Sequence, residues 1–148
     1  MMTLRERLVE EMKVAMKAKD DLKLSVIRMV RSSIKNREID LKRELDDQGI
    51  TEIIAGVVKQ RKESIRLFKE AGREDLVAKE EKELALLLEF LPKQLDRGEI
   101  EALVAKAIAE CGAHGAGDLG KVMKVLKPLV AGVADGKLVN DIVREKLA

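Results

Sequence analysis

Basic side chains recur at helical spacing in the C-terminal part of the sequence, and anion binding is the chemistry that this spacing suggests. Lys121, Lys124 and Lys127 follow one another at intervals of three residues. Residues three apart are neighbours on the surface of an α-helix, so the three ammonium groups form one cationic strip. Few acidic residues lie beside it. A phosphate-binding surface and a solvated helix face both fit this strip, and the two interpretations stay open.

A longer basic stripe lies in the N-terminal part of the sequence. Its members share one face of a helix over about 20 Å, and they are Lys59, Lys62, Arg66, Lys69 and Arg73. Such a stripe can follow a phosphate backbone, where each contact releases counterions and adds affinity. The next segment is rich in Asp and Glu, so ion pairing with that segment is the favoured interpretation. The same interpretation applies to a more broken basic set, which comprises Arg28, Arg31, Lys35 and Lys42.

No combination of residues predicts catalysis. Cys111 and His114 have the C-x-x-H spacing of metal ligands, but a structural zinc site needs four ligands and no second pair exists. His114 is the only histidine, which leaves no credible nucleophile–histidine relay. The glycines near Asp118 do not form a phosphate-loop motif. We therefore expect no catalytic residue, no metal site and no cofactor.

The composition favours an all-α protein. Of the 148 residues, 46% are hydrophobic and 38% are charged, whereas only two are proline and only two are aromatic. Such a composition is typical of amphipathic helices. Apolar periodicity predicts an N-terminal bundle of about four helices over residues 1–93 and a small three-helix tail over residues 94–148. Leu91-Pro92 separates the two, because the residue before proline disfavours helical dihedrals.

Capping residues and apolar spacing predict the individual helices. The first helix is expected over about Leu4–Ala18, and the second starts after a cap at Asp20 or Asp21 and has inward positions as far as Leu45. The third should run from a Thr51 cap to Gly72, and the fourth over about Glu74–Phe90. In the tail, a capping box of Asp96 and Glu99 should start a helix that closes at Cys111-Gly112. Asp118 should cap the next helix, and Asp135 the last.

Several side-chain positions also follow from the helical period. Met16 should face inward on the first helix and Arg61 on the third. Leu129 should lie on the buried face of the sixth helix, which we expect to kink or end at Lys127 because Pro128 lacks an N–H group.

Charge and composition also bound the location and the partners. The net charge is +2, from 29 basic and 27 acidic residues, so any anion site must be local. The first residues contain no apolar h-region, and no apolar run approaches the roughly 18 residues of a membrane span. A single cysteine fits a reducing compartment. We expect a cytoplasmic protein without membrane association. A nucleic-acid partner should be structured, because single strands are held largely by stacking of their bases on aromatic rings and the chain has only two aromatic residues.

Three stretches, Leu24–Asp40, Val57–Leu95 and Asp118–Leu147, carry a family resemblance over nearly the whole chain. They include LSVIRMVRSSIKNREID, the LP hinge and DLGKVMKVLKPLVAGVADGKLVNDIVREKL. The chain resembles the GatB/YqeY family of small stand-alone proteins. Their C-terminal part is similar to the tail domain of the B subunit of glutamyl-tRNA(Gln)/aspartyl-tRNA(Asn) amidotransferase.

The resemblance implies an all-α fold and a tRNA-contacting tail, since the tail of the amidotransferase helps to hold the tRNA near its elbow. By matching position, the phosphate contacts would come from Lys121, Lys124, Lys127 and Lys137. A family label of carbon–nitrogen ligase with glutamine as amide donor is implied too. The resemblance does not imply the reaction itself, because the kinase-like cradle and the amidase partner have no counterpart in this chain.

Two functional hypotheses follow. The first is a non-catalytic accessory protein that binds tRNA through the tail lysines, with Lys59, Lys62 and Arg66 as further candidates. The second is a helical adaptor that docks a protein partner on the long charged hairpin of the third and fourth helices. The sequence leaves the oligomeric state, the RNA and the protein partner open.

Overall fold

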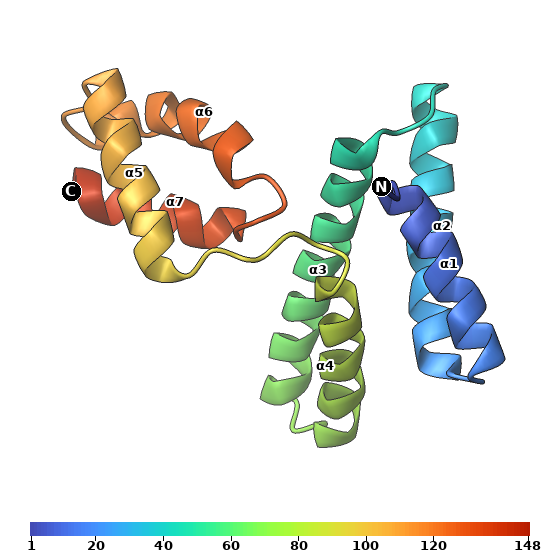
Figure 1. Ribbon diagram of the computed structural model, residues 1–148. Helices are drawn as coiled ribbons and strands as arrows, with labels where there is room; N and C mark the ends of the chain where they lie inside the picture. Colours follow the sequence, from blue (N-terminus) through green and yellow to red (C-terminus); the bar gives the residue numbers. More distant parts are fainter. The chain divides into compact units, whose positions relative to one another are not determined.

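The computed structural model describes all 148 residues, and it contains seven α-helices, one 3-10 turn and no strand (Figure 1). The helices are α1 (Leu4–Lys17), α2 (Asp21–Leu41), α3 (Asp47–Glu70), α4 (Glu74–Leu88), α5 (Arg97–Cys111), α6 (Leu119–Val130) and α7 (Gly136–Leu147), and the 3-10 turn is η1 (Ala116–Asp118). The prediction of an all-α fold is confirmed. The chain divides into two compact units, Met1–Leu91 with α1 to α4 and Pro92–Ala148 with α5 to α7.

The N-terminal unit is built on two helical hairpins, α1 with α2 and α3 with α4 (Figure 1). Its core consists of aliphatic side chains from all four helices, among them Leu8, Ile27, Val30, Ile54 and Leu87, each with at most 1% of its surface exposed. Short turns make the helices of each hairpin antiparallel neighbours, as the sequence predicts. Met16 does not join this core. It is 51% exposed, because Leu8 and Ala15 form the buried face of α1.

Two boundaries in the N-terminal unit differ from the prediction by more than two residues. α3 begins at Asp47, four residues before Thr51, because the carboxylate of Asp46 accepts a hydrogen bond from the N–H group of Gly49 at 2.9 Å. α2 ends at Leu41 and not near Leu45, because Lys42 adopts a left-handed conformation. Leu45 is buried all the same, so its periodic position reflects a loop that packs on the core.

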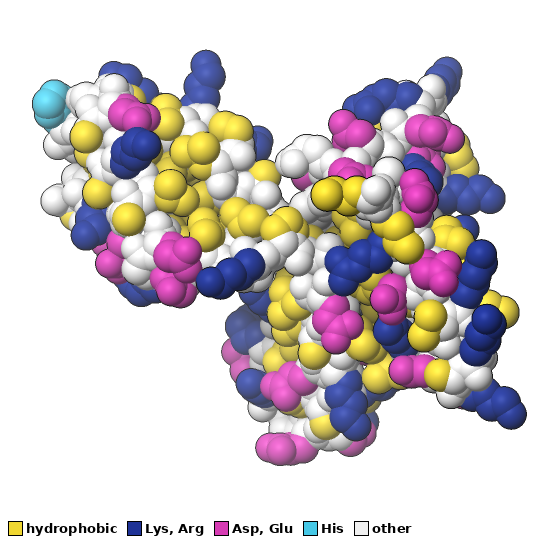
Figure 2. All heavy atoms as spheres, viewed as in Figure 1, with side chains coloured by type: hydrophobic (Ala, Val, Ile, Leu, Met, Phe, Trp, Pro, Cys, Tyr) yellow, Lys and Arg dark blue, Asp and Glu magenta, His cyan; other side chains and the backbone are white.

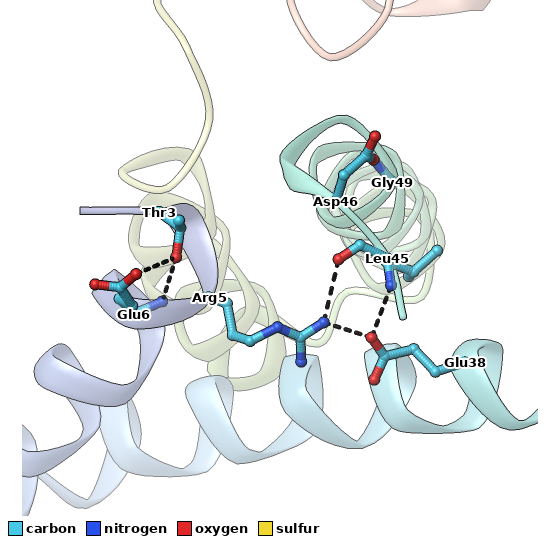
Figure 3. A network of polar contacts seen from close by, with 7 residues as sticks. All are labelled: Thr3, Arg5, Glu6, Glu38, Leu45, Asp46 and Gly49. Carbon is cyan, nitrogen blue, oxygen red and sulfur yellow. Dashed lines mark hydrogen bonds and ion pairs between the residues drawn. The ribbon is translucent and has the colours of Figure 1, made fainter. Parts of the chain in front are cut away.

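A polar network fastens this loop to α1 and α2 (Figure 3). The guanidinium group of Arg5 donates to the carbonyl oxygen of Leu45 at 3.2 Å and forms an ion pair with Glu38. The Glu38 carboxylate also accepts the N–H group of Leu45 at 2.8 Å. This backbone hydrogen bond, and next the hydrogen bond from Arg5, lower the pKa of Glu38 below its ordinary value.

The C-terminal unit consists of three helices around an aliphatic core, which includes Ile100, Val104, Leu126, Val139 and Ile142. The predicted capping box is present: the Asp96 carboxylate accepts from the N–H group of Glu99 at 2.8 Å, and the Glu99 carboxylate accepts from the N–H group of Asp96 at 3.3 Å. Gly112 ends α5 at φ +63°, which is a conformation that favours glycine.

α6 begins directly after Asp118, as predicted, but it departs from the prediction at its C-terminal end and in the hydrogen bonding of its cap. Pro128 lies inside the helix, which continues to Val130, and burial of Leu126 and Val130 on either side of the proline holds this last turn in place. Leu129, expected on the buried face, is 51% exposed. At the start of the helix, the Asp118 carboxylate accepts the N–H group of His114 at 2.9 Å and makes no capping hydrogen bond to α6.

Candidate nucleic-acid interface

The three lysines of the C-terminal strip lie on the exposed side of α6. Lys121, Lys124 and Lys127 are all exposed, and none of them takes part in an ion pair. The buried side of the same helix carries Val122 and Leu126, both with no exposed surface. Because the core fixes the rotation of α6, the ammonium groups are held toward solvent, where they are free to meet an anion.

Lys137, the fourth tail lysine, belongs to α7. It is exposed in the first turn of that helix, and its N–H group donates to the Asp135 carboxylate at 3.0 Å, which confirms Asp135 as the cap. The strip itself therefore consists of the three α6 lysines. Lys137 stands on another helix of the same unit.

One carboxylate lies near the start of the strip. The N–H group of His114 first, and the positive charge of Lys121 to a smaller extent, lower the pKa of Asp118 below its ordinary value. Asp118 is therefore ionised at neutral pH. It offsets part of the charge of Lys121 and leaves Lys124 and Lys127 as the more strongly positive end of the strip.

The basic stripe on α3 is divided between paired and unpaired residues. Arg66 forms ion pairs with Glu63 at 2.6 Å and Glu70 at 2.7 Å on its own helix. Further along, Lys69 pairs with Glu81 at 3.5 Å. Arg73, expected on the same helix face, lies beyond the end of α3 at the N-cap of α4 and pairs with Asp75 at 3.2 Å. Ion pairing thus accounts for the C-terminal half of the stripe, partly with α4 as predicted and partly within α3. Lys59 and Lys62 are exposed and take part in none of these pairs.

Two acidic residues of α4 form ion pairs with Arg61 of α3, and this cluster was not predicted from the sequence. Arg61 forms ion pairs with Glu80 at 2.9 Å and with Glu83 at 2.8 Å, and Glu83 is buried. The Arg61 guanidinium also contacts the Met29 sulfur at 3.0 Å. The inward position of Arg61 in the helical period was the available signal, because a buried arginine needs carboxylate partners. The cluster joins α2, α3 and α4.

The structure places no group of metal-binding side chains around Cys111 and His114. The Cys111 sulfur contacts the Ile108 carbonyl oxygen at 3.9 Å, and no group of three or more His, Cys, Asp or Glu side chains is placed to hold a metal ion. No helix combines the length and the apolar character that crossing a bilayer requires. Basic and acidic side chains are interspersed over the visible surface of both units (Figure 2).

Comparison with known proteins identifies relatives of this chain. A family model described as Yqey-like protein matches residues 5–147. The "Altered inheritance of mitochondria protein 41, mitochondrial" of Eremothecium gossypii is 40% identical over 130 residues, which make up 84% of this chain and 70% of that protein. Its namesake in Kluyveromyces lactis is 40% identical over 107 residues, 70% of this chain and 57% of that protein. The namesake in Vanderwaltozyma polyspora is 45% identical over 85 residues, 57% of this chain and 46% of that protein.

These relatives contradict one prediction. The cytoplasmic location expected from the sequence is wrong on this finding, since the relatives are named as mitochondrial proteins. The expectation rested on the composition of the first residues and on a single cysteine, and neither feature distinguishes one reducing compartment from another. The family model extends over all seven helices, and the chain belongs to the Yqey-like protein family.

Proposed function

We propose that this chain is a non-catalytic accessory protein that binds structured RNA of the tRNA type through the α6 lysine strip. One observation carries the proposal: Lys121, Lys124 and Lys127 are exposed and without ion pairs on a helix whose opposite side carries the buried side chains of Val122, Leu126 and Val130. The resemblance of the tail to the tRNA-contacting domain of the amidotransferase B subunit supports it. Phosphate is the group that such lysines bind, through charge and counterion release.

The scarcity of aromatic side chains favours a folded RNA over a single strand. Of the two aromatic residues, Phe90 is 3% exposed and Phe68 is half-buried. Phe90 is also covered by the guanidinium group of Arg7, 5.1 Å from the ring centroid. No exposed ring is therefore available for stacking on an unpaired base. A folded RNA, in contrast, presents its phosphates in a fixed arrangement that lysines recognise by shape.

The remaining candidate residues would contribute unequally. Lys137, Lys59 and Lys62 are exposed and take part in no ion pair, so each is available for a phosphate. Arg66 is held between Glu63 and Glu70, so an RNA phosphate must compete with two carboxylates for its guanidinium group. We therefore expect Arg66 to contribute less than either α3 lysine.

The test is the affinity of the full chain for folded tRNA over a series of salt concentrations. The double variant Lys121→Glu/Lys124→Glu should bind more weakly, and the slope of log K against log salt should become shallower by about 2, which corresponds to about one released counterion for each lost phosphate contact. Lys13→Glu/Lys17→Glu is the matched control, because these α1 residues are exposed and the change in net charge is the same. It should bind nearly as well as the wild type.

Absence of tRNA binding at low salt would refute the proposal, and so would equal losses in the variant and in its control. A stable protein partner that is captured with the chain and is indifferent to nuclease would favour the adaptor hypothesis instead.

A further inference from the structure

A cavity of about 650 Å³ lies between α1 and α2 in the N-terminal unit. This volume is in the range of small-molecule sites, which is about 300–1,000 Å³. α1 contributes Leu8 and Val9, and α2 contributes Ile34 together with three basic residues, Arg28, Arg31 and Lys35. The cavity therefore combines an apolar part with a cationic part.

The apolar part forms the floor of the cavity. Leu8 is 1% exposed and Ile34 is 4% exposed, so both belong to the core of the unit, and Val9 is half-buried beside them. The core fixes these side chains in position. Val9 is the accessible member of the three, so an apolar group that packs on it would remove apolar surface from water without rearranging the protein.

The cationic part consists of side chains without carboxylate partners. Arg28, Arg31 and Lys35 follow one another on α2 at intervals of three and four residues, so they share one face of the helix. All three are exposed, and none takes part in an ion pair. The Arg31 guanidinium contacts the Met12 sulfur at 3.1 Å, and a thioether sulfur is a weak acceptor. Their hydrogen-bond donors are therefore available to a ligand.

The negative charge of the acidic residue in the cavity, Glu38, is offset by an ion pair with Arg5. Glu38 and Arg5 also line the cavity, and the Glu38 carboxylate is held by Arg5 and by the Leu45 N–H group (Figure 3). It repels an incoming anion less than a free carboxylate would, since its charge is offset by Arg5. The remaining charge in the cavity is that of Arg28, Arg31 and Lys35. Ser32, which also lines the wall, adds a hydroxyl group.

We propose that this cavity is a binding site for a small amphiphilic anion, a phosphate monoester with an apolar body. The phosphate group would lie among Arg28, Arg31 and Lys35. A guanidinium group binds two phosphate oxygens through two parallel hydrogen bonds, and a lysine adds a point charge. The apolar body would lie on Val9, beside the nearly buried side chains of Leu8 and Ile34. This site is separate from the α6 strip and does not depend on RNA binding.

Calorimetric titration of the full chain with hexyl phosphate tests the site, with inorganic phosphate and 1-hexanol as comparison ligands. Hexyl phosphate should bind with a dissociation constant at least about tenfold lower than that of either comparison ligand, because it alone engages both parts of the cavity. Equal affinity for hexyl phosphate and inorganic phosphate would overturn the proposal, because the floor would then contribute nothing.

Two variants assign the binding to this cavity. Arg28→Gln/Lys35→Gln should raise the dissociation constant for hexyl phosphate about tenfold or more. The control Lys13→Gln/Arg37→Gln removes the same two charges from exposed positions outside the lining and should leave that dissociation constant unchanged. Val9→Thr keeps the shape of the floor. It should weaken the binding of hexyl phosphate but leave the affinity for inorganic phosphate unchanged. Unchanged affinity in Arg28→Gln/Lys35→Gln would refute the site. Lys121→Glu/Lys124→Glu should retain hexyl phosphate binding whether or not it has lost tRNA.

Discussion

Replacing Arg61 by methionine should be among the most damaging single changes in the N-terminal unit. Arg61 is the shared partner of Glu80 and Glu83, at 2.9 Å and 2.8 Å. Methionine keeps much of the side-chain volume beside Met29 but removes the positive charge. Two carboxylates would then face each other in a half-buried site with no cation between them.

The size of the effect follows from the burial of the three side chains. They are 21%, 15% and 9% exposed for Arg61, Glu80 and Glu83, so the charges are largely withdrawn from water. Removing one partner of a buried ion pair costs about 3–5 kcal/mol, and the residual exposure here places the loss near about 3 kcal/mol. The buried Nε atom of Arg61, which has no hydrogen-bond partner, already costs part of what the pairs contribute.

Urea unfolding of the wild type and Arg61→Met measures this loss. A loss of about 3 kcal/mol lowers the midpoint by about 1.5 M when the slope is about 2 kcal/mol per M. Arg66→Met is the matched control, because Arg66 also pairs with two glutamates but is 54% exposed, and it should cost less than about 1 kcal/mol.

The triple variant Arg61→Met/Glu80→Leu/Glu83→Leu should recover most of the stability, because it leaves no unpaired charge. Equal losses for Arg61→Met and Arg66→Met would show that burial does not determine the cost of breaking these pairs. The reasoning would then be wrong.

Two further predictions concern stability. The pKa of Glu38 is lowered in the folded state by the Leu45 N–H group and by Arg5, so the stabilisation is present above the unfolded pKa of about 4.3 and is lost as the pH falls through the folded value. Glu38→Gln should therefore lower the free energy of unfolding at pH 7, and the difference from the wild type should shrink below about pH 4; a difference that is independent of pH would contradict this. Gly112→Ala should lower the free energy of unfolding by about 1 kcal/mol, because Gly112 has a positive φ. Gly120→Ala lies inside α6 with open space for a Cβ atom, so it should raise the free energy of unfolding by up to about 1 kcal/mol. Thermal unfolding measures both, and equal effects would show that φ is not the cause.

Much of the helical framework could be predicted from the sequence, because local interactions determine it. The Asp96–Glu99 capping box and the left-handed Gly112 require only residues a few positions apart. The start of α3 was predicted incorrectly, because Asp46 and Thr51 are both good caps and local preference does not choose between them. The loop that ends at Asp46 is fixed by Glu38 and Arg5, which come from two other helices.

The candidate sites show the same division. The spacing of Lys121, Lys124 and Lys127 predicts one strip, and the exposed face of α6 carries them. Their use by RNA stays a prediction. The α1–α2 cavity was not predicted. Its basic residues were noted as a broken set on one helix, but the apolar floor comes from Leu8 and Val9 on another.

The sequence by itself determined that this chain is all-α, where most of its helices begin and end, and which faces of those helices are apolar, since each of these depends on neighbouring residues and on the 3.6-residue period. Only the tertiary structure decided which charges are paired. Arg61 and Arg66 lie five residues apart on one helix, yet Arg61 is held by two glutamates of α4 and Arg66 by two of its own helix. The packing of α3 against α4 makes that difference. It brings Arg61 into contact with carboxylates about twenty residues further along the chain, and it withdraws these groups from water.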